Sequence, residues 1–174
     1  MKNVLLVFAL MCSMVVSVHA QYPTVDQVVA KHMEAVAEYN IAHPIHDDGF
    51  DIRESITEYG PVDLNNLPQG VTQQMAQAYN ALCASGSANL QLGDSYFNPA
   101  RTLYLDACWY EADGLRAFGG ESPYNTPNYY IAIQRYSVAK SKYISSQQGL
   151  DWGRDFYALA KADYDAAGIM LIGW

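Results

Sequence analysis

The sequence predicts an all-α protein, built as a helical bundle or as an irregular array of helical hairpins with about five helices. Apolar residues recur at three- and four-residue steps in five stretches, and residues typical of helix starts precede several of these stretches. Alternation of polar and apolar residues over four or more positions is nearly absent, which argues against strands. Helices should therefore form most of the core.

The N-terminal residues have the pattern of a cleavable secretory signal. Lys2 precedes an apolar run from Val4 to Val18, and small residues end the segment at Ala20. The pattern predicts a signal peptide over residues 1–20 and a single helical domain over 21–174, located in the periplasm or secreted. This run is shorter than the roughly 20 apolar residues that cross a bilayer. No later segment approaches that length, so we expect a soluble mature chain without a membrane segment.

The first expected helix runs from Thr24 to about His43. Its apolar positions repeat at helical spacing, and Thr24 and Gln27 are placed to form a capping box. Pro44 is expected to end this helix, because proline lacks the backbone N–H that an inner helical turn needs. Residues 45–70 are rich in Asp, Asn, Pro and Gly and are predicted to be largely loop, with a short helix possible over 51–59.

Two helices are expected next. One starts near Thr72, and another opens at Asn98-Pro99, a cap residue followed by proline at the first helical position. The latter should close at Gly119-Gly120, since glycine is the preferred residue beyond a helix C-terminus.

The C-terminal part predicts two further helices. Thr126-Pro127 repeats the start signal, and the fourth helix should run to about Ser146. The fifth is expected to begin at Asp151 and to end near Gly168, which leaves an apolar tail that finishes at Trp174.

One internal pattern stands out: an alanine, a tyrosine four residues later, and a second alanine three residues after that. On a helix these three positions form one stripe, where alanine lets a neighbouring backbone approach and tyrosine fills the space beside it. We therefore expect the four tyrosines to pack between helices. The copies are Ala35/Tyr39/Ala42, Ala100/Tyr104/Ala107, Ala132/Tyr136/Ala139 and Ala160/Tyr164/Ala167.

The stripe resembles the second helix of a tetratricopeptide repeat, and Leu92-Gly93 followed by Tyr96 resembles that family's first helix. The resemblance covers about 20 residues and implies stacked helical hairpins. The segment between Tyr96 and Ala100 is short for the turn of such a hairpin, and the other three copies lack the Leu-Gly pair. An irregular bundle with small-residue interfaces is the alternative that we favour.

Cys83 and Cys108 remain after signal cleavage, and an even cysteine count in an exported protein predicts one disulfide. The two sulfurs would meet across a hairpin only if the helix from Thr72 continued to about Leu92. The alternative is a pair of buried free thiols.

The segment from His43 to Asp51 contains the most ligand-like side chains. His43, His46, Asp47 and Asp51 could bind a divalent metal such as zinc. A solvated acidic loop explains the same residues without a metal. A metal-dependent or carboxylate-dependent hydrolase that uses this loop is the alternative function.

The charge and the aromatic content favour a binding protein over an enzyme. The formal charge of −8 and the scattered Lys and Arg argue against nucleic acid and anionic lipid as partners. The 14 tyrosines suit protein interfaces, because a phenol offers an apolar face and a hydroxyl that can stay hydrated. We expect a protein or peptide partner, no resident cofactor, and contacts from Tyr124, Tyr129, Tyr130 and Trp174.

Overall fold

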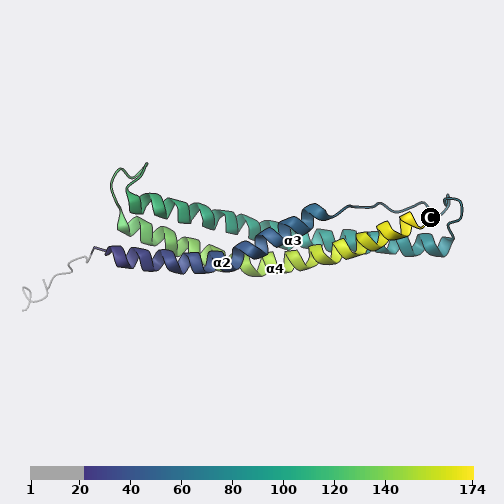
Figure 1. Cartoon of the computed structure of the whole chain (residues 1–174), viewed down its shortest axis with the longest axis horizontal. Helices are drawn as coiled ribbons and strands as arrows, with labels where there is room; N and C mark the ends of the chain where they lie inside the picture. Colours follow the sequence, from purple (N-terminus) through teal and green to yellow (C-terminus); the bar gives the residue numbers. More distant parts are fainter. Residues whose placement is uncertain (1–21) are drawn as a thin grey trace, which may run out of the picture.

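The computed structural model describes residues 22–174, and three long helices make up most of this part of the chain (Figure 1). They are α2 (Val25–Ser55), α3 (Gln73–Gly119) and α4 (Tyr129–Ile172). α3 and α4 form an antiparallel hairpin, and α2 runs in the same direction as α4. Near the start of α2, α4 lies between the other two helices. The result is a rod-shaped helical bundle, as the sequence predicts in class, with fewer and longer helices than the five expected. The predicted signal peptide lies outside the described residues.

A seven-residue repeat explains why the helices are long. Buried positions follow one another at alternating steps of three and four residues, with a small residue and then a large one in each repeat. Three of the stripe tyrosines, Tyr104, Tyr136 and Tyr164, are at most 5% exposed, and Tyr39 is half-buried, so the packing prediction is confirmed. In α4 the buried series is Ala132, Tyr136, Ala139, Tyr143, Ser146, Leu150, Gly153, Tyr157, Ala160, Tyr164 and Ala167.

Small residues bring the backbones of α3 and α4 close together. A Cβ atom on Gly93 would lie 2.4 Å from Cδ1 of Tyr157, and one on Gly153 would lie 2.5 Å from Cβ of Phe97. Each large side chain thus occupies the space that a glycine of the partner helix leaves free. This small-against-large pairing sets the register of the hairpin.

Helix ends differ from the sequence prediction at both internal prolines. α2 continues through Pro44 and α3 continues through Pro99, while α4 runs unbroken across the predicted break between Ser146 and Asp151. Both proline side chains are exposed. The carbonyl groups that lose a helical partner there can bond to water, and packing along the buried repeat offsets the local penalty.

The continuous α3 overturns two expectations. Cys83 and Cys108 lie on the same helix, about 25 residues and therefore about 37 Å apart, far beyond the reach of a disulfide. Both are free thiols. Leu92 and Tyr96 belong to that same helix as Ala100, so no turn separates them and the tetratricopeptide arrangement is absent from this segment.

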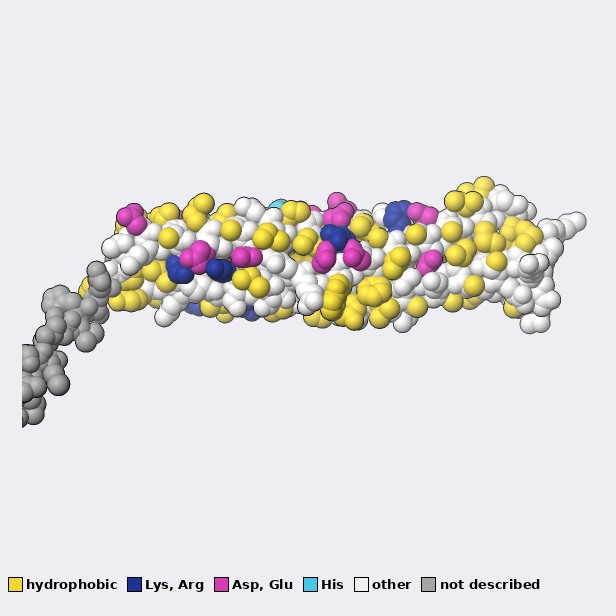
Figure 2. Space-filling model, turned by 90° about the horizontal axis from the view of Figure 1, so that it is seen from below, with side chains coloured by type: hydrophobic (Ala, Val, Ile, Leu, Met, Phe, Trp, Pro, Cys, Tyr) yellow, Lys and Arg dark blue, Asp and Glu magenta, His cyan; other side chains and the backbone are white. Residues whose placement is uncertain are grey.

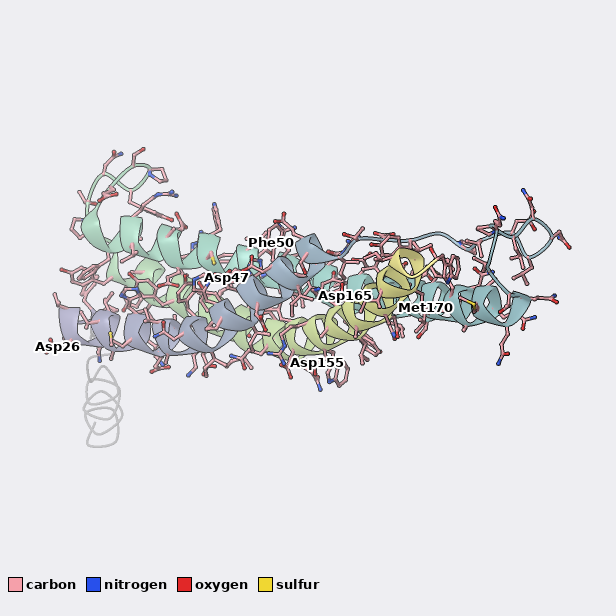
Figure 3. All side chains as sticks on the ribbon, turned by 45° about the vertical axis from the view of Figure 1, so that its right-hand side comes forward. Asp26, Asp47, Phe50, Asp155, Asp165 and Met170 are labelled. Atoms are coloured by element: carbon pink, nitrogen blue, oxygen red, sulfur yellow. The ribbon has the colours of Figure 1, made fainter. Side chains whose placement is uncertain are left out.

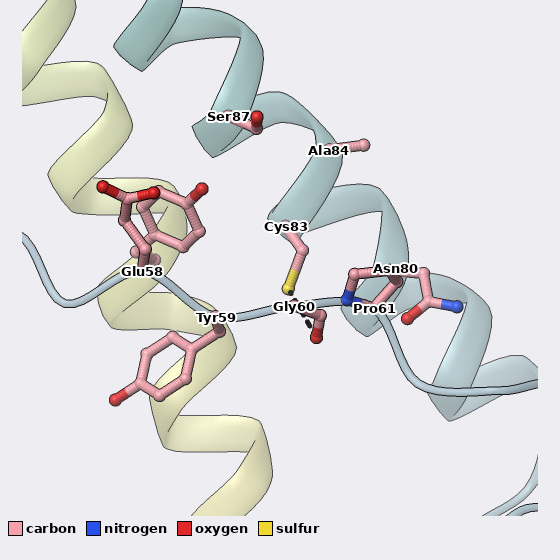
Figure 4. A pocket seen from close by; sticks show the side chains of 9 residues that line it. Glu58, Tyr59, Gly60, Pro61, Asn80, Cys83, Ala84 and Ser87 are labelled. Atoms are coloured by element: carbon pink, nitrogen blue, oxygen red, sulfur yellow. Dashed lines mark hydrogen bonds between the residues drawn. The ribbon is translucent and has the colours of Figure 1, made fainter.

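Beyond the end of α2, an extended segment replaces a third helix along the hairpin. The carbonyl oxygen of Gly60 accepts a hydrogen bond from the hydroxyl of Tyr79 at 3.0 Å. The amide side chain of Asn80 bonds both the N–H and the carbonyl of Val62, at 2.8 and 2.9 Å. Figure 4 shows Cys83 pointing from α3 towards Gly60 in the same place. These bonds fix the extended segment on α3 and leave a hollow of about 450 Å³ beside it.

A buried ion pair anchors the turn between α3 and α4. Asp113 is 4% exposed, lies 2.7 Å from Nε of Arg135, and accepts a hydrogen bond from the hydroxyl of Tyr124 at 2.7 Å. Gly120 is the C-cap of α3, and its φ of 72° is the left-handed conformation that favours glycine. A Cβ there would lie 2.6 Å from the backbone nitrogen of Pro127.

Within residues 22–174, none of the helices is long and apolar enough to cross a membrane.

Candidate functional site: the groove between α2 and α3

A groove opens between α2 and α3 because both helices pack on α4 and make little contact with each other. Its volume is about 290 Å³. His32 and His43 of α2, which are only partly buried, reach Glu111 and Tyr104 of α3 across its base. The groove is lined by Tyr39 of α2, by Cys108, Glu111, Ala112 and Leu115 of α3, and by Tyr143 of α4.

Glu111 connects the three helices at the base of the groove. One carboxylate oxygen lies 3.1 Å from Nε2 of His32 on α2. The other accepts a hydrogen bond of 2.8 Å from the hydroxyl of Tyr143 on α4, which also lies 3.5 Å from Sγ of Cys108. Burial raises the pKa of Tyr143 well above its usual range, and the neighbouring Cys108 and Glu111 act in the same direction. The phenol therefore stays protonated and acts as a hydrogen-bond donor.

A second polar cluster lies further along α2. The hydroxyl of Tyr104 and Nδ1 of His43 are 2.9 Å apart, and Nε2 of His43 lies 3.4 Å from a carboxylate oxygen of Asp47. The ring of His46 stacks on Tyr104 with the centroids 4.5 Å apart. Figure 3 shows Asp47 and Phe50 on the part of α2 that crosses towards α3. The three histidines between residues 22 and 174 thus all serve contacts between α2 and α3.

The residues proposed as metal ligands all occupy one helix, whereas the sequence predicted that the first helix ends near His43 and that a loop follows, with a short helix possible from Asp51. His43, His46, Asp47 and Asp51 all lie within α2, with Nδ1 of His46 2.9 Å from Asp47 and with Asp51 exposed one turn later. In the part of the chain that the structure describes, no group of three or more His, Cys, Asp and Glu side chains is arranged to hold a metal ion. The hydrolase hypothesis therefore gains no geometric support here.

The aromatic residues proposed for partner contact do not form one site. Tyr124 is tied inward by Asp113, and Tyr129 packs on Phe118 with the ring centroids 5.6 Å apart. Tyr130 is 45% exposed and lines, with Tyr129, a hollow of about 300 Å³ near the start of α2.

Trp174 lies at the opposite end of the rod and packs on Tyr79, with the ring centroids 5.1 Å apart. The length of α4, about 66 Å for its 44 residues, separates it from the other three predicted residues. The C-terminal tail therefore docks on the protein's own surface.

Exposed apolar side chains lie on both helices that form the groove. Leu115, which lines the groove, is 46% exposed, and Leu105 of α3, which is not part of the lining, is 49% exposed, although leucine is usually buried. On α2, Val25, Val29 and Met33 form an exposed stripe at four-residue spacing. This stripe is turned away from the side of α2 that carries Glu34 and Glu38, which bond to Lys140 and Gln147 of α4.

Sequence reasoning did not find this groove, because it depends on which helices pack together. The seven-residue repeat was the available signal: His32 and Glu111 occupy repeat positions that carry large buried residues elsewhere. Polar residues at such positions indicate a hydrogen-bonded network in a bundle core.

No protein-family model, curated protein or solved structure matches this chain.

Proposed function

We propose that this protein is an exported binding protein that holds an amphipathic helix of a protein partner in the groove between α2 and α3. The observation that carries the proposal is the packing of α2 and α3 on α4 without close packing on each other. The three helices thus occupy three of the four positions of a four-helix bundle. The fourth position, opposite α4, is open, and a partner helix there would bury side chains that are now exposed.

The lining of the groove specifies the chemistry of the partner helix. Leu115 offers an apolar contact in the groove, and Leu105 offers a further exposed apolar side chain about 15 Å, or about three helical turns, earlier along α3. A ligand helix with apolar residues at steps of three, four and seven residues fits such a surface. The carboxylate of Glu111, already bonded on both oxygens, adds negative charge at the base and favours a partner with Lys or Arg nearby.

A binding role is favoured over a catalytic one because the polar groups of the groove are hydrogen-bonded to one another. Glu111, His32 and Tyr143 bond to one another and so stabilise the junction of three helices. Groups used in this way hold the walls of a binding site in place.

Export is supported by the signal-like residues 1–20. Mass spectrometry of the protein recovered from the producing cells tests it, because the mature chain should begin at Gln21.

Site-specific photo-crosslinking tests the groove. A photo-reactive amino acid replaces Leu115 in the groove, and a matched variant carries it at Ile169, which is 72% exposed near the C-terminal end of α4. Crosslinking in the producing cells should capture one partner from position 115 and not from position 169. A synthetic peptide of the captured segment should then bind the purified protein, become helical on binding, and bind at least tenfold more weakly to Leu115→Asn.

Capture of the same partner from both positions would contradict the proposal. So would a captured segment that stays non-helical when bound, or one whose affinity is unchanged by Leu115→Asn.

A further inference from the structure

A second surface lies on the α3–α4 hairpin, on the side of α4 that is turned away from α2. Tyr96 of α3 contacts Trp152 and Phe156 of α4, with ring centroids 5.3 and 5.7 Å apart. Tyr96 and Trp152 are 37% and 47% exposed. Leu92 and Leu159 are also exposed and lie one helical turn from members of this cluster, which we call the aromatic patch. Figure 2 shows that apolar side chains are spread between charged ones on the face of the rod that it displays.

The aromatic patch differs from three other partly exposed rings, those of Trp109, Tyr110 and Phe50. Arg135 lies over Trp109 and Tyr110 at 5.8 and 5.4 Å from the ring centroids, and Lys142 also lies over Tyr110. Arg101 lies over Phe50 at 5.4 Å. These are the cation–ring contacts found within residues 22–174, and none involves the aromatic patch. The rings of the aromatic patch therefore lack the cations that the chain supplies to Trp109, Tyr110 and Phe50.

Carboxylates outnumber positive charges next to the aromatic patch. Arg154 has one guanidinium group, which lies 2.6 Å from Asp151, 2.8 Å from Asp155 and 3.8 Å from Asp48. One positive charge therefore faces three negative ones. Asp151 directly precedes Trp152, and Asp155 lies one helical turn after Asp151. The side chains of Asp151 and Asp155 are 47% and 62% exposed. Figure 3 shows Asp155 on the outer side of α4.

Exposed aromatic rings and surplus carboxylates attract the same kind of group. The face of an indole or phenol ring attracts a guanidinium or ammonium ion, and nearby negative charge adds to that attraction. An anionic occupant would be repelled by Asp151 and Asp155 and by the net charge of −8. A purely apolar occupant would gain nothing from the negative charge of Asp151 and Asp155.

We propose that the aromatic patch binds a cationic segment of a protein partner, with Arg or Lys side chains over Trp152 and Tyr96 and beside Asp151 and Asp155. The site is separate from the groove between α2 and α3, and the inference does not depend on the helix-binding function proposed for that groove. Arginine fits better than lysine, because its planar guanidinium can stack on a ring and bond a carboxylate at the same time.

The experiment measures the affinity of a fluorescent nona-arginine peptide for the full protein by anisotropy at about 150 mM salt. Trp152→Leu keeps an apolar side chain and removes the aromatic face, so it should weaken binding about tenfold. The matched control is Trp109→Leu, since Trp109 is 53% exposed but already lies under Arg135. The control should change the affinity less than twofold.

The double variant Asp151→Asn, Asp155→Asn should also weaken binding and reduce its dependence on salt. Circular dichroism melting of each variant establishes that the fold is retained. The proposal is overturned if nona-arginine fails to bind at millimolar protein, if both tryptophan variants weaken binding equally, or if the aspartate variant binds as tightly as the original protein.

Discussion

Two buried tyrosines should respond in opposite directions to the same substitution. Tyr136 and Tyr143 are 1% and 0% exposed and occupy successive large positions of the repeat in α4. The hydroxyl of Tyr136 is buried without a hydrogen-bond partner, whereas that of Tyr143 donates to Glu111 at 2.8 Å and lies 3.5 Å from Cys108. Replacement by phenylalanine removes one oxygen atom in each case and leaves the ring in place.

The magnitudes follow from hydrogen-bond energetics. A buried hydroxyl without a partner destabilises the folded state by about 1 to 3 kcal/mol, so Tyr136→Phe should stabilise the protein by about 1 kcal/mol. Tyr143→Phe removes a hydrogen bond to a carboxylate and leaves one oxygen of Glu111 without its donor. That change should reduce the free energy of unfolding by about 2 to 3 kcal/mol.

Urea unfolding followed by far-UV circular dichroism measures both effects. The midpoint should rise for Tyr136→Phe and fall for Tyr143→Phe, with the slope unchanged in both variants. For a chain of this size, 1 kcal/mol corresponds to about 2 to 4 °C in melting temperature. A loss of stability in both variants, or equal midpoints for the two, would show that the difference in hydrogen bonding is not what distinguishes these positions.

Three further predictions concern packing, pH and redox state. Gly153→Ala should destabilise the protein by at least about 2 kcal/mol in the same urea assay, because its Cβ would lie 2.5 Å from Phe97 and 2.8 Å from that residue's backbone nitrogen. Gly119→Ala, where the nearest atom is 3.6 Å away, is the control and should be neutral or slightly stabilising; equal losses would refute the close-packing argument. Burial raises the pKa of Tyr136 to about 12, above the value of about 10 in an unfolded chain, so stability should be intact below pH 10 and fall as the pH rises towards 12. Tyr136 alone should account for about 2 kcal/mol of this loss, and other buried tyrosines with raised pKa values, such as Tyr143, should add to it. Urea midpoints that do not change between pH 9 and 12 would contradict this, as would phenolate absorbance that appears in full near pH 10 before unfolding. The two cysteines of α3 should both react with a thiol reagent after denaturation without reductant, and an intramolecular disulfide in the mass spectrum would show that α3 is broken.

The sequence predicted the helical class and the ends that local chemistry determines. The capping box of Thr24 and Gln27 is present, Thr72 is the N-cap of α3, and Gly120 closes that helix in the left-handed conformation. α4 begins two to three residues after the predicted Thr126-Pro127 signal, with Asn128 as its cap. These features involve neighbours within a few residues, so their energies are fixed by the local sequence.

Burial of the stripe tyrosines was also predictable, since alanines at steps of three and four residues form a surface that another helix can approach closely. The helix end predicted at Pro44 and the helix start predicted at Pro99 were wrong, because both predictions used only neighbouring residues. Proline at position 99 suits the first turn of a helix, yet it is also tolerated on the exposed face of a long one, and Pro44 shows the same. A short window cannot distinguish these cases, because the energy that keeps the helix unbroken comes from partners far away in the chain.

The sequence by itself therefore determined that the chain is helical, where most helices begin, and which side chains face inward, because periodicity and capping are properties of short segments. Only the tertiary structure decided that five predicted helices merge into three, that Cys83 and Cys108 stay apart, and that α2 and α3 share α4 without closing on each other. The packing of glycine against tyrosine across α3 and α4 favours long unbroken helices, because it stabilises continuous contact between residues that are distant in the sequence. The groove and the aromatic patch are consequences of that pairing, because they lie where the three long helices leave side chains uncovered.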